Sequence, residues 1–212
     1  MEMSTTRRRA VAACLSAAAC LALAACSDTS DSAAEGHRNK NEKGAVTGEF
    51  TTPAFDLPAD LKVRIEPPGP TGNARKDAVL RDIGYAAAAQ IEAFAKGTGD
   101  TPNMRRYYAG EATPYLHDTI AKYHDQGRTL TGTYVYYGFT LDALGANTAD
   151  GHYCEDQQIG YSKEFRTGRI LVTKRSDDSY VETRIRAKRS ARGDWQVRTY
   201  VAERATSSCV RH

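Results

Sequence analysis

The side chains with the most versatile chemistry in this sequence are its five cysteines. Cys14, Cys20 and Cys26 lie in an uncharged run near the start of the chain, whereas Cys154 and Cys209 stand far apart in its second half. A thiol can accept a covalent modification, form a disulfide or bind a metal, and its surroundings and compartment decide which. The two groups of cysteines therefore need separate explanations.

The first 25 residues have the layout of a secretory leader. Arg7–Arg9 give a positive segment, and residues 10–25 are an uncharged run dominated by alanine. A stable membrane-spanning helix needs about 20 strongly apolar residues, so this shorter run favours export and cleavage. We interpret residues 1–25 as a signal peptide, and the three arginines leave both the general secretory and the twin-arginine route open.

The end of this leader, Leu23-Ala24-Ala25-Cys26, resembles the bacterial lipobox, in which a branched apolar residue and two small residues precede a cysteine. The resemblance implies that the Cys26 thiol carries a diacylglyceryl group, which holds the mature protein on the outer face of the cell membrane. The alternative is an ordinary leader in which Cys26 is incidental. The similar stretch that ends at Cys20 lacks the branched residue, which makes Cys26 the better site.

Cys154 and Cys209 are the two cysteines that remain after the leader and Cys26 are set aside. Two cysteines in an exported domain are typical of one disulfide, and these two are 55 positions apart. The alternative is a pair of buried free thiols. Because nothing in the sequence fixes a histidine beside either one, we predict no catalytic cysteine.

The histidines offer little support for metal chemistry. His117 and His124 are seven positions apart and can share a helical face, but a metal site normally needs three or four ligands. In the segment from His152 to Asp156, strand alternation divides the promising side chains between opposite faces, and a surface edge is the simpler interpretation. We predict no metal, no cofactor and no catalytic residue.

Charge gives little indication of a partner for the chain as a whole. The sequence has 29 basic and 26 acidic residues, and loss of the leader leaves 26 and 25, so we expect no nucleic-acid partner. The last predicted hairpin should carry a basic stripe on its outward face, formed by Arg184, Arg186, Lys188 and Arg198. The stripe could meet anionic lipids, a wall polymer or an acidic envelope protein, or it could equally be a solvated face that resists edge pairing.

Residues 26–72 are predicted to form a lipidated tether and a Pro-rich extension. Residues 27–50 have almost no large apolar side chain and cannot bury enough surface to offset the entropy of ordering. About 24 flexible residues would hold a domain roughly 25–30 Å from the bilayer. Residues 51–71 contain five prolines, which favour extended backbone, either as a stiff spacer or as a collar against the domain.

The globular domain is predicted over residues 73–212, and it begins with helices. Asn73 can cap a helix whose apolar positions follow 3–4 spacing and which ends at Gly97. A short helix is expected over residues 103–108, and a third runs from Thr113-Pro114 to Gly127.

The second half of the chain has strand patterns, which lie over residues 131–141, 152–161, 169–174, 180–188 and 195–203. Gly138 indicates a bend in the first of them. The last two alternate between apolar and polar side chains on either side of a turn at Arg192-Gly193-Asp194, which predicts a hairpin.

This order of elements predicts an α+β fold, with two or three N-terminal helices packed on a curved antiparallel sheet of about four strands. It resembles the nuclear transport factor two-like superfamily, the fold of ketosteroid isomerases and SnoaL-like polyketide cyclases, and more closely small actinobacterial lipoproteins of that shape. The resemblance covers residues 73–209. It rests on the leading helix, the bent strand at residues 134–141 and the closing hairpin.

In the enzymes of that superfamily a cavity lies between the helices and the concave sheet, and an acidic residue, often with a tyrosine, transfers a proton there. The resemblance implies that such a set would be drawn from Tyr85, Tyr107, Tyr123, Tyr136 and Asp142. Tyrosines at these spacings also fill protein cores.

Two functions therefore remain open, because a fold does not fix a function. The first is a non-enzymatic binding or assembly module of the cell envelope. The second is a small ligand-binding protein or enzyme with a cyclase-like or isomerase-like pocket. A cavity that holds a desolvated carboxylate beside a tyrosine or histidine would favour the second, and a cone filled by side chains would favour the first. The sequence carries no indication of the oligomeric state.

Overall fold

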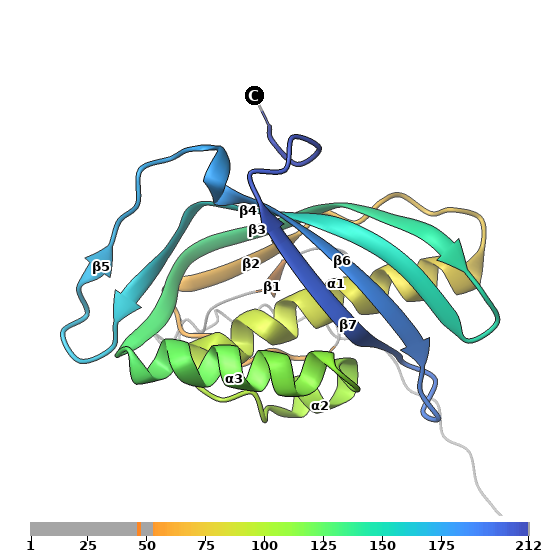
Figure 1. Cartoon of the computed structure of the whole chain (residues 1–212), viewed down its shortest axis with the longest axis horizontal. Helices are drawn as coiled ribbons and strands as arrows, with labels where there is room; N and C mark the ends of the chain where they lie inside the picture. Colours follow the sequence, from red (N-terminus) through yellow and green to blue (C-terminus); the bar gives the residue numbers. More distant parts are fainter. Residues whose placement is uncertain (1–45, 48–52, 212) are drawn as a thin grey trace, which may run out of the picture. The chain divides into compact units, whose positions relative to one another are not determined.

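A computed structural model describes residues 46–47 and 53–211. The predicted leader, the lipidation site Cys26 and most of the predicted tether lie outside the described residues. In the part that is described, three helices pack against one face of a curved mixed sheet (Figure 1). The predicted α+β class is therefore confirmed. Among these residues, no helix combines the length and the apolar character needed to cross a membrane.

The sheet has the order β1-β2-β3-β4-β6-β7, and β5 pairs with β4 alone. The pairs from β3 onward are antiparallel, whereas β1, β2 and β3 pair in parallel. The strands are β1 (Val46–Thr47), β2 (Leu61–Ile65), β3 (Arg128–Leu144), β4 (Thr148–Glu164), β5 (Ile170–Leu171), β6 (Tyr180–Arg189) and β7 (Trp195–Arg204).

The three helices form close to their predicted ranges, and the first begins and ends at its predicted caps. α1 (Ala74–Lys96) begins after Asn73, whose side chain accepts hydrogen bonds from two backbone N–H groups, and it ends at Gly97, whose φ of 67° is left-handed. α2 (Pro102–Tyr107) is capped by Thr101. α3 (Ala112–Asp125) begins after Glu111, so the predicted cap Thr113 lies inside the helix. A short 3₁₀ turn, η1 (Asp177–Ser179), completes the helical elements of the described chain.

The Pro-rich extension contains a strand of the core, which the sequence prediction missed. Leu61, Val63 and Ile65 are buried and alternate with exposed residues, and β2 pairs in parallel with β3. The collar interpretation therefore describes this segment better than the stiff spacer. Two corrections follow, because the sheet is mixed rather than antiparallel and the folded domain begins well before the predicted boundary at residue 73.

The curvature of the sheet comes from irregular pairing between two long strands. β3 and β4 have 17 residues each, and their register shifts at three places, one of them between Tyr137 and Thr140. Gly138 lies inside that shift with a φ of 64°, as the prediction of a bend requires. A register shift of this kind places an extra residue in one strand, which increases the local twist and bends that strand. The concave face that results is turned toward the helices (Figure 1).

The hairpin of β6 and β7 forms as predicted, but its alternation changes part of the way along. Arg186 pairs with Thr199 and Ala187 pairs with Val197, so that Arg198 is an extra residue in β7. Such a bulge moves every later side chain to the opposite face. Tyr200 consequently faces the helices, where its hydroxyl accepts a hydrogen bond from α1, and Val201 is 64% exposed.

Cys154 of β4 is joined to Cys209 of the C-terminal tail by a disulfide, which is the pairing that the cysteine count predicts. The two sulfur atoms belong to a small apolar cluster that also contains Tyr137 and Tyr180. The Tyr137 hydroxyl donates to the Cys209 carbonyl, and the Arg211 guanidinium lies over the Tyr137 ring. This cluster is separate from the main core between the helices and the sheet.

Candidate functional site

A cavity of about 950 Å³ lies between the helices and the concave face of the sheet. Its walls come from α1, α3, the four longest strands and the loop before β6. The apolar and aromatic part of its lining consists of Ile91, Phe94, Tyr115, Leu116, Tyr123, Leu130, Tyr134, Tyr161, Val181, Tyr200 and Ala202. The cone is therefore open over this region, although side chains fill the rest of the space under the sheet.

Glu155 is the acidic side chain that the sheet delivers to this cavity. It lies in the middle of β4, where it pairs with Tyr136 of β3 and Val181 of β6, and the residue is only 6% exposed. Gln157 donates a hydrogen bond of 2.9 Å to its Oε1 atom, and the Tyr136 hydroxyl also bonds to it. Burial raises the pKa of the Glu155 carboxyl, because desolvation outweighs these hydrogen bonds.

Polar side chains connect this carboxyl to the rim of the cavity. Arg204 donates a hydrogen bond of 3.1 Å to the Gln157 amide oxygen and a second one of 2.9 Å to the backbone carbonyl of Asp178. The Arg204 guanidinium lowers the pKa of Glu155, but by less than burial raises it. A continuous path of polar groups thus runs from an exposed arginine to a buried carboxyl.

Two tyrosine hydroxyls at the cavity are engaged by protein groups. Tyr123 lies 2.6 Å from the Ser162 hydroxyl, and Tyr200 accepts a hydrogen bond of 3.1 Å from Gln90. Burial raises the pKa of Tyr123, and it raises the pKa of Tyr200 to about 12. Both phenols therefore remain protonated at neutral pH, and they can donate hydrogen bonds but not act as bases.

This arrangement can perform two kinds of chemistry. A protonated Glu155 can donate a hydrogen bond to a carbonyl or hydroxyl oxygen in the cavity, since a desolvated carboxyl stays neutral to higher pH. Once ionised, the same group can accept a proton from a bound molecule, and a pKa closer to neutrality suits that role. Either use depends on the apolar walls, which keep water from the carboxyl.

The tyrosines and the aspartate that the fold resemblance singled out do not form one site. Tyr123 lines the cavity and Tyr136 bonds to Glu155, so these two belong to it. Tyr85 and Tyr107 pack on each other with ring centroids 5.5 Å apart and do not line the cavity. Asp142 pairs with His152 at 3.1 Å, and both are partly solvent-exposed.

The interpretation of residues 152–156 as a surface edge is wrong, and this is why Glu155 was missed. β4 pairs with β3 on one side and with β6 on the other, so the segment lies in the interior of the sheet. Alternation does divide its side chains, with Cys154 in the disulfide cluster and Tyr153 and Glu155 on the concave side. One feature of the sequence did indicate its position. Glu155 stands two residues after Tyr153, and alternate residues of a strand project from the same face.

The two helical histidines pack against glycines rather than facing each other. A Cβ on Gly97 would lie 2.2 Å from His124 Nδ1, and a Cβ on Gly99 would lie 2.4 Å from His117 Cδ2. His124 also stacks on Phe165 with ring centroids 4.8 Å apart. In the described chain, no group of three or more histidine, cysteine or acidic side chains is placed to hold a metal.

The predicted basic stripe is interrupted in two ways. Arg184 pairs with Glu182 at 2.7 Å and Arg186 pairs with Asp150 at 2.6 Å, so both cations face acidic side chains. Lys188 is exposed at the end of β6. Arg198 does not belong to the stripe, because its guanidinium packs over Gly110 between α2 and α3, where a Cβ would lie 2.8 Å from its Nε atom. The bulge in β7 is the physical reason for this correction.

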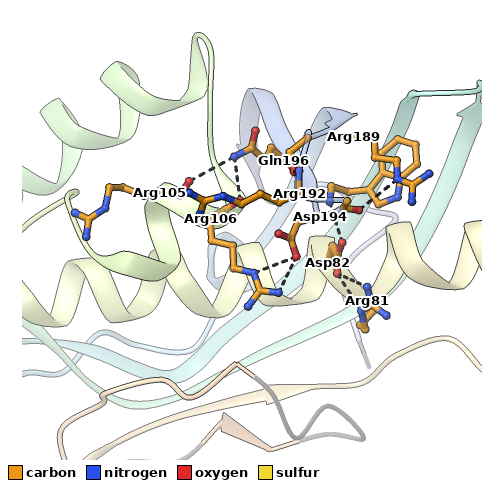
Figure 2. Close-up of polar contacts among 11 residues, drawn as sticks. Arg81, Asp82, Arg105, Arg106, Arg189, Arg192, Asp194 and Gln196 are labelled. Atoms are coloured by element: carbon orange, nitrogen blue, oxygen red, sulfur yellow. Dashed lines mark hydrogen bonds and ion pairs between the residues drawn. The ribbon is translucent and has the colours of Figure 1, made fainter. Parts of the chain in front are cut away.

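A second cluster of charged residues joins the helices to the start of β7 (Figure 2). Asp82 of α1 is 1% exposed and accepts hydrogen bonds from the Trp195 backbone N–H at 2.9 Å and from Arg81. Arg106 of α2 bonds to Asp194 at 2.7 Å. Burial raises the pKa of Asp82 in spite of these donors. None of these residues lines the cavity, and the contacts tie three elements together.

Comparisons with known proteins give similarity at the level of the fold. No family model and no curated protein matches the sequence. Similar solved structures include the intermembrane space region of the chloroplast protein ARC6 (15% identity over 64% of this chain and 99% of that one, TM-score 0.42). Another is a ketosteroid isomerase-like protein from Erwinia carotovora (17% identity over 59% of this chain and 95% of that one, TM-score 0.39). A third is a domain of unknown function with a cystatin-like fold from Nostoc punctiforme (12% identity over 60% of this chain and 77% of that one, TM-score 0.40). Similarity of this degree does not identify a ligand.

Proposed function

We propose that this protein is a lipid-anchored, extracytoplasmic binding protein whose concave cavity holds a small amphiphilic molecule. The observation that carries the proposal is the burial of Glu155 at a cavity of about 950 Å³. A cone filled by side chains would have favoured an assembly module of the envelope. An open cavity with a desolvated carboxyl beside Tyr136 favours the ligand-binding alternative.

The chemistry of the walls defines the ligand class. The volume lies at the upper end of the roughly 300–1,000 Å³ typical of small-molecule sites, and aromatic and aliphatic side chains dominate such sites. Glu155 and Gln157 supply a polar end, and Arg204 adds a cation toward the rim. We expect a ring-shaped or branched apolar body with a carbonyl or hydroxyl oxygen directed at Glu155.

The proposed location rests on the sequence. The lipobox-like end of the leader supports a lipid on Cys26, and the polar segment that follows supports a spacer between bilayer and domain. A disulfide between Cys154 and Cys209 suits an oxidising compartment outside the cytoplasm. The membrane is then the first partner of the protein, and the cavity ligand is the second.

A second candidate function is proton transfer on the bound molecule. It is favoured by the raised pKa of Glu155 and by the hydrogen bond from Tyr136, because perturbed carboxyls in cavities are typical of acid-base sites. Glu155→Gln keeps the shape and removes the exchangeable carboxyl proton. If that variant binds the ligand but no longer converts it, Glu155 is a catalytic residue; if the wild-type protein releases its ligand unchanged, the protein is a binding protein.

Two neighbouring residues of β7 allow a direct test of the cavity. Ala202 lines it, whereas Val201 points to the opposite face and is 64% exposed. We expect Ala202→Trp to weaken binding of the fluorescent probe anilinonaphthalene sulfonate about tenfold, which corresponds to about 1.4 kcal/mol. Val201→Trp adds the same side chain outside the cavity and should leave the affinity unchanged. Equal affinities of the two variants would contradict the proposal.

A further inference from the structure

The hairpin formed by the end of β4, β5 and the segment that follows it exposes an unusual amount of apolar surface. We call residues 159–176 the flap. Among the described residues, six large hydrophobic side chains are exposed, and four of them lie in the flap. They are Ile159 (42% exposed), Phe165 (46%), Ile170 (48%) and Val172 (71%). Single exposed apolar residues are ordinary, but a group in one segment indicates an interaction surface.

The same segment carries a local excess of positive charge. Residues 163–175 contain five basic side chains and one acidic side chain, in a chain that is otherwise nearly balanced. Lys163 pairs with Asp60, and Arg169 pairs with Glu164. The other three, Arg166, Lys174 and Arg175, are exposed and form no ion pair within the described chain. Asp177 and Asp178 follow directly, at the base of the flap.

The geometry of the flap presents both kinds of side chain together. β5 pairs with β4 alone, and Figure 1 shows the chain from β5 to η1 arching out beyond β4 at one end of the sheet. The tip of the flap lies beside the end of α3, where one face of Phe165 stacks on His124. Lys163 lies directly opposite Ile170 in the ladder, and residues opposite each other project from the same face. Along the chain, Arg166 follows Phe165, and Lys174 and Arg175 come shortly after Val172, so the free cations alternate with the exposed apolar side chains. Gly168 closes the tip with a φ of 72°.

We propose that the flap docks on the surface of an anionic lipid bilayer. The apolar side chains would enter the boundary between headgroups and acyl chains, and the free cations would contact lipid phosphates. A bilayer offers both environments within a few ångström of each other, so it matches an interleaved surface. This docking is independent of the cavity ligand and of the lipid on Cys26. It would also orient the cavity, because Thr173 and Lys174 of the flap lie at its wall.

A fluorophore that responds to its surroundings can test this contact whatever else holds the chain to a vesicle. We would attach nitrobenzoxadiazole at Val172→Cys, and in a matched protein at Ala191→Cys, in the full chain with serine at positions 14, 20 and 26. Ala191 lies in the turn beyond the other end of β6, roughly 30 Å away along a strand of ten residues. Unlabelled Cys154 and Cys209 remain in their disulfide.

With vesicles that contain phosphatidylglycerol, we expect the emission at position 172 to shift to the blue and to increase several-fold. Vesicles of phosphatidylcholine alone should give little change, and the probe at position 191 should respond to neither. Arg166→Gln with Arg175→Gln should weaken vesicle binding roughly 10–30-fold, because each cation near an anionic surface contributes about a factor of five. Lys188→Gln with Arg192→Gln removes the same charge elsewhere and should have no such effect.

Four results would overturn the proposal. An unchanged probe at position 172, or an equal response at positions 172 and 191, would show that the flap does not enter the bilayer. A shift that depends on protein concentration without vesicles would assign the surface to a second copy of the chain. A shift produced by polyglutamate and not by vesicles would assign it to an acidic protein.

Discussion

Removal of the disulfide tests how the convex side of the sheet is held. The bond joins Cys154 in the middle of β4 to Cys209 in the tail, and both residues are buried, at 6% and 0% exposed. The change to be made is Cys154→Ala together with Cys209→Ala. The tail is then held by the Tyr137 hydroxyl bond, the ring contact and Glu66 ion pair of Arg211, the packing of Val210 and a few further hydrogen bonds.

The size of the effect follows from the loop that the bond closes. The two cysteines are 55 positions apart, and in the chain-entropy treatment a loop of that length contributes about 4 kcal/mol through the unfolded state. Loss of the two sulfur atoms from their apolar cluster adds to this. For a domain of this size, 4 kcal/mol corresponds to a decrease of about 8–16 °C in the midpoint of thermal unfolding.

Urea unfolding followed by tryptophan fluorescence is a suitable assay, since Trp195 is buried in the main core. A reductant should lower the free energy of unfolding of the wild-type protein by the same amount as the double substitution does. It should not change the free energy of unfolding of the variant. If the free energy of unfolding of the double variant lies less than about 1 kcal/mol below that of the wild type, the cross-link does not supply the expected stability. Ordinary surface substitutions already change this free energy by up to about 0.5 kcal/mol.

Three further predictions concern single residues. Cys26→Ser should abolish incorporation of labelled fatty acid and release the protein from the membrane fraction; full retention of the variant would contradict lipidation. Glu155→Gln should change the pH dependence of stability. The unfolded glutamate ionises near pH 4.5, whereas burial raises the pKa of the folded one, which therefore keeps its proton to higher pH. Wild-type stability should then fall as the pH rises from 4.5 through the folded pKa, and the variant should lack this fall in urea titrations. Asp82→Ala should lower the free energy of unfolding by roughly 1–3 kcal/mol in urea titrations, because it leaves the buried backbone N–H of Trp195 without an acceptor. Asp82→Asn keeps an acceptor oxygen and should lower it by less.

The helices could be predicted because the information that forms them is local. Asn73 and Gly97 stand at the two ends of α1 and act there as caps, and the apolar residues between them face the core. The strands β3, β4, β6 and β7 were also found, since β-branched and aromatic runs between turn residues are local signals. The predicted strand over residues 169–174 is reduced to two residues, because only Ile170 and Leu171 have a partner strand.

Features that depend on distant pairing could not be predicted in the same way. β2 has a buried alternation of only five residues among prolines, and its partner β3 lies about 70 positions further along the chain. The bulge at Arg198 likewise depends on the register with β6, and a single extra residue there exchanged the faces of Tyr200 and Val201. Local alternation gives the period of a strand but not the point at which the period is broken.

The candidate site shows the same limit in its chemistry. Sequence patterns select acidic residues by type, and Asp142 and Glu155 are equivalent by that criterion. What separates them is the number of neighbouring strands and the face. Asp142 is partly exposed beside His152, whereas Glu155 has a strand on each side and helices above it, so only Glu155 loses its solvation. Its raised pKa is therefore a property of the assembled sheet.

Adjacent residues of β4 link the two sides of this sheet and allow their roles to be separated. Cys154 faces the disulfide cluster and Glu155 faces the cavity. Glu155 is positioned by ladder pairing with β3 and β6 and by Gln157, and none of these contacts involves the tail. The variant without the disulfide should therefore bind anilinonaphthalene sulfonate with unchanged affinity well below its lowered unfolding midpoint. Loss of probe binding under conditions in which that variant is still folded would mean that the tail, acting through β4, shapes the cavity.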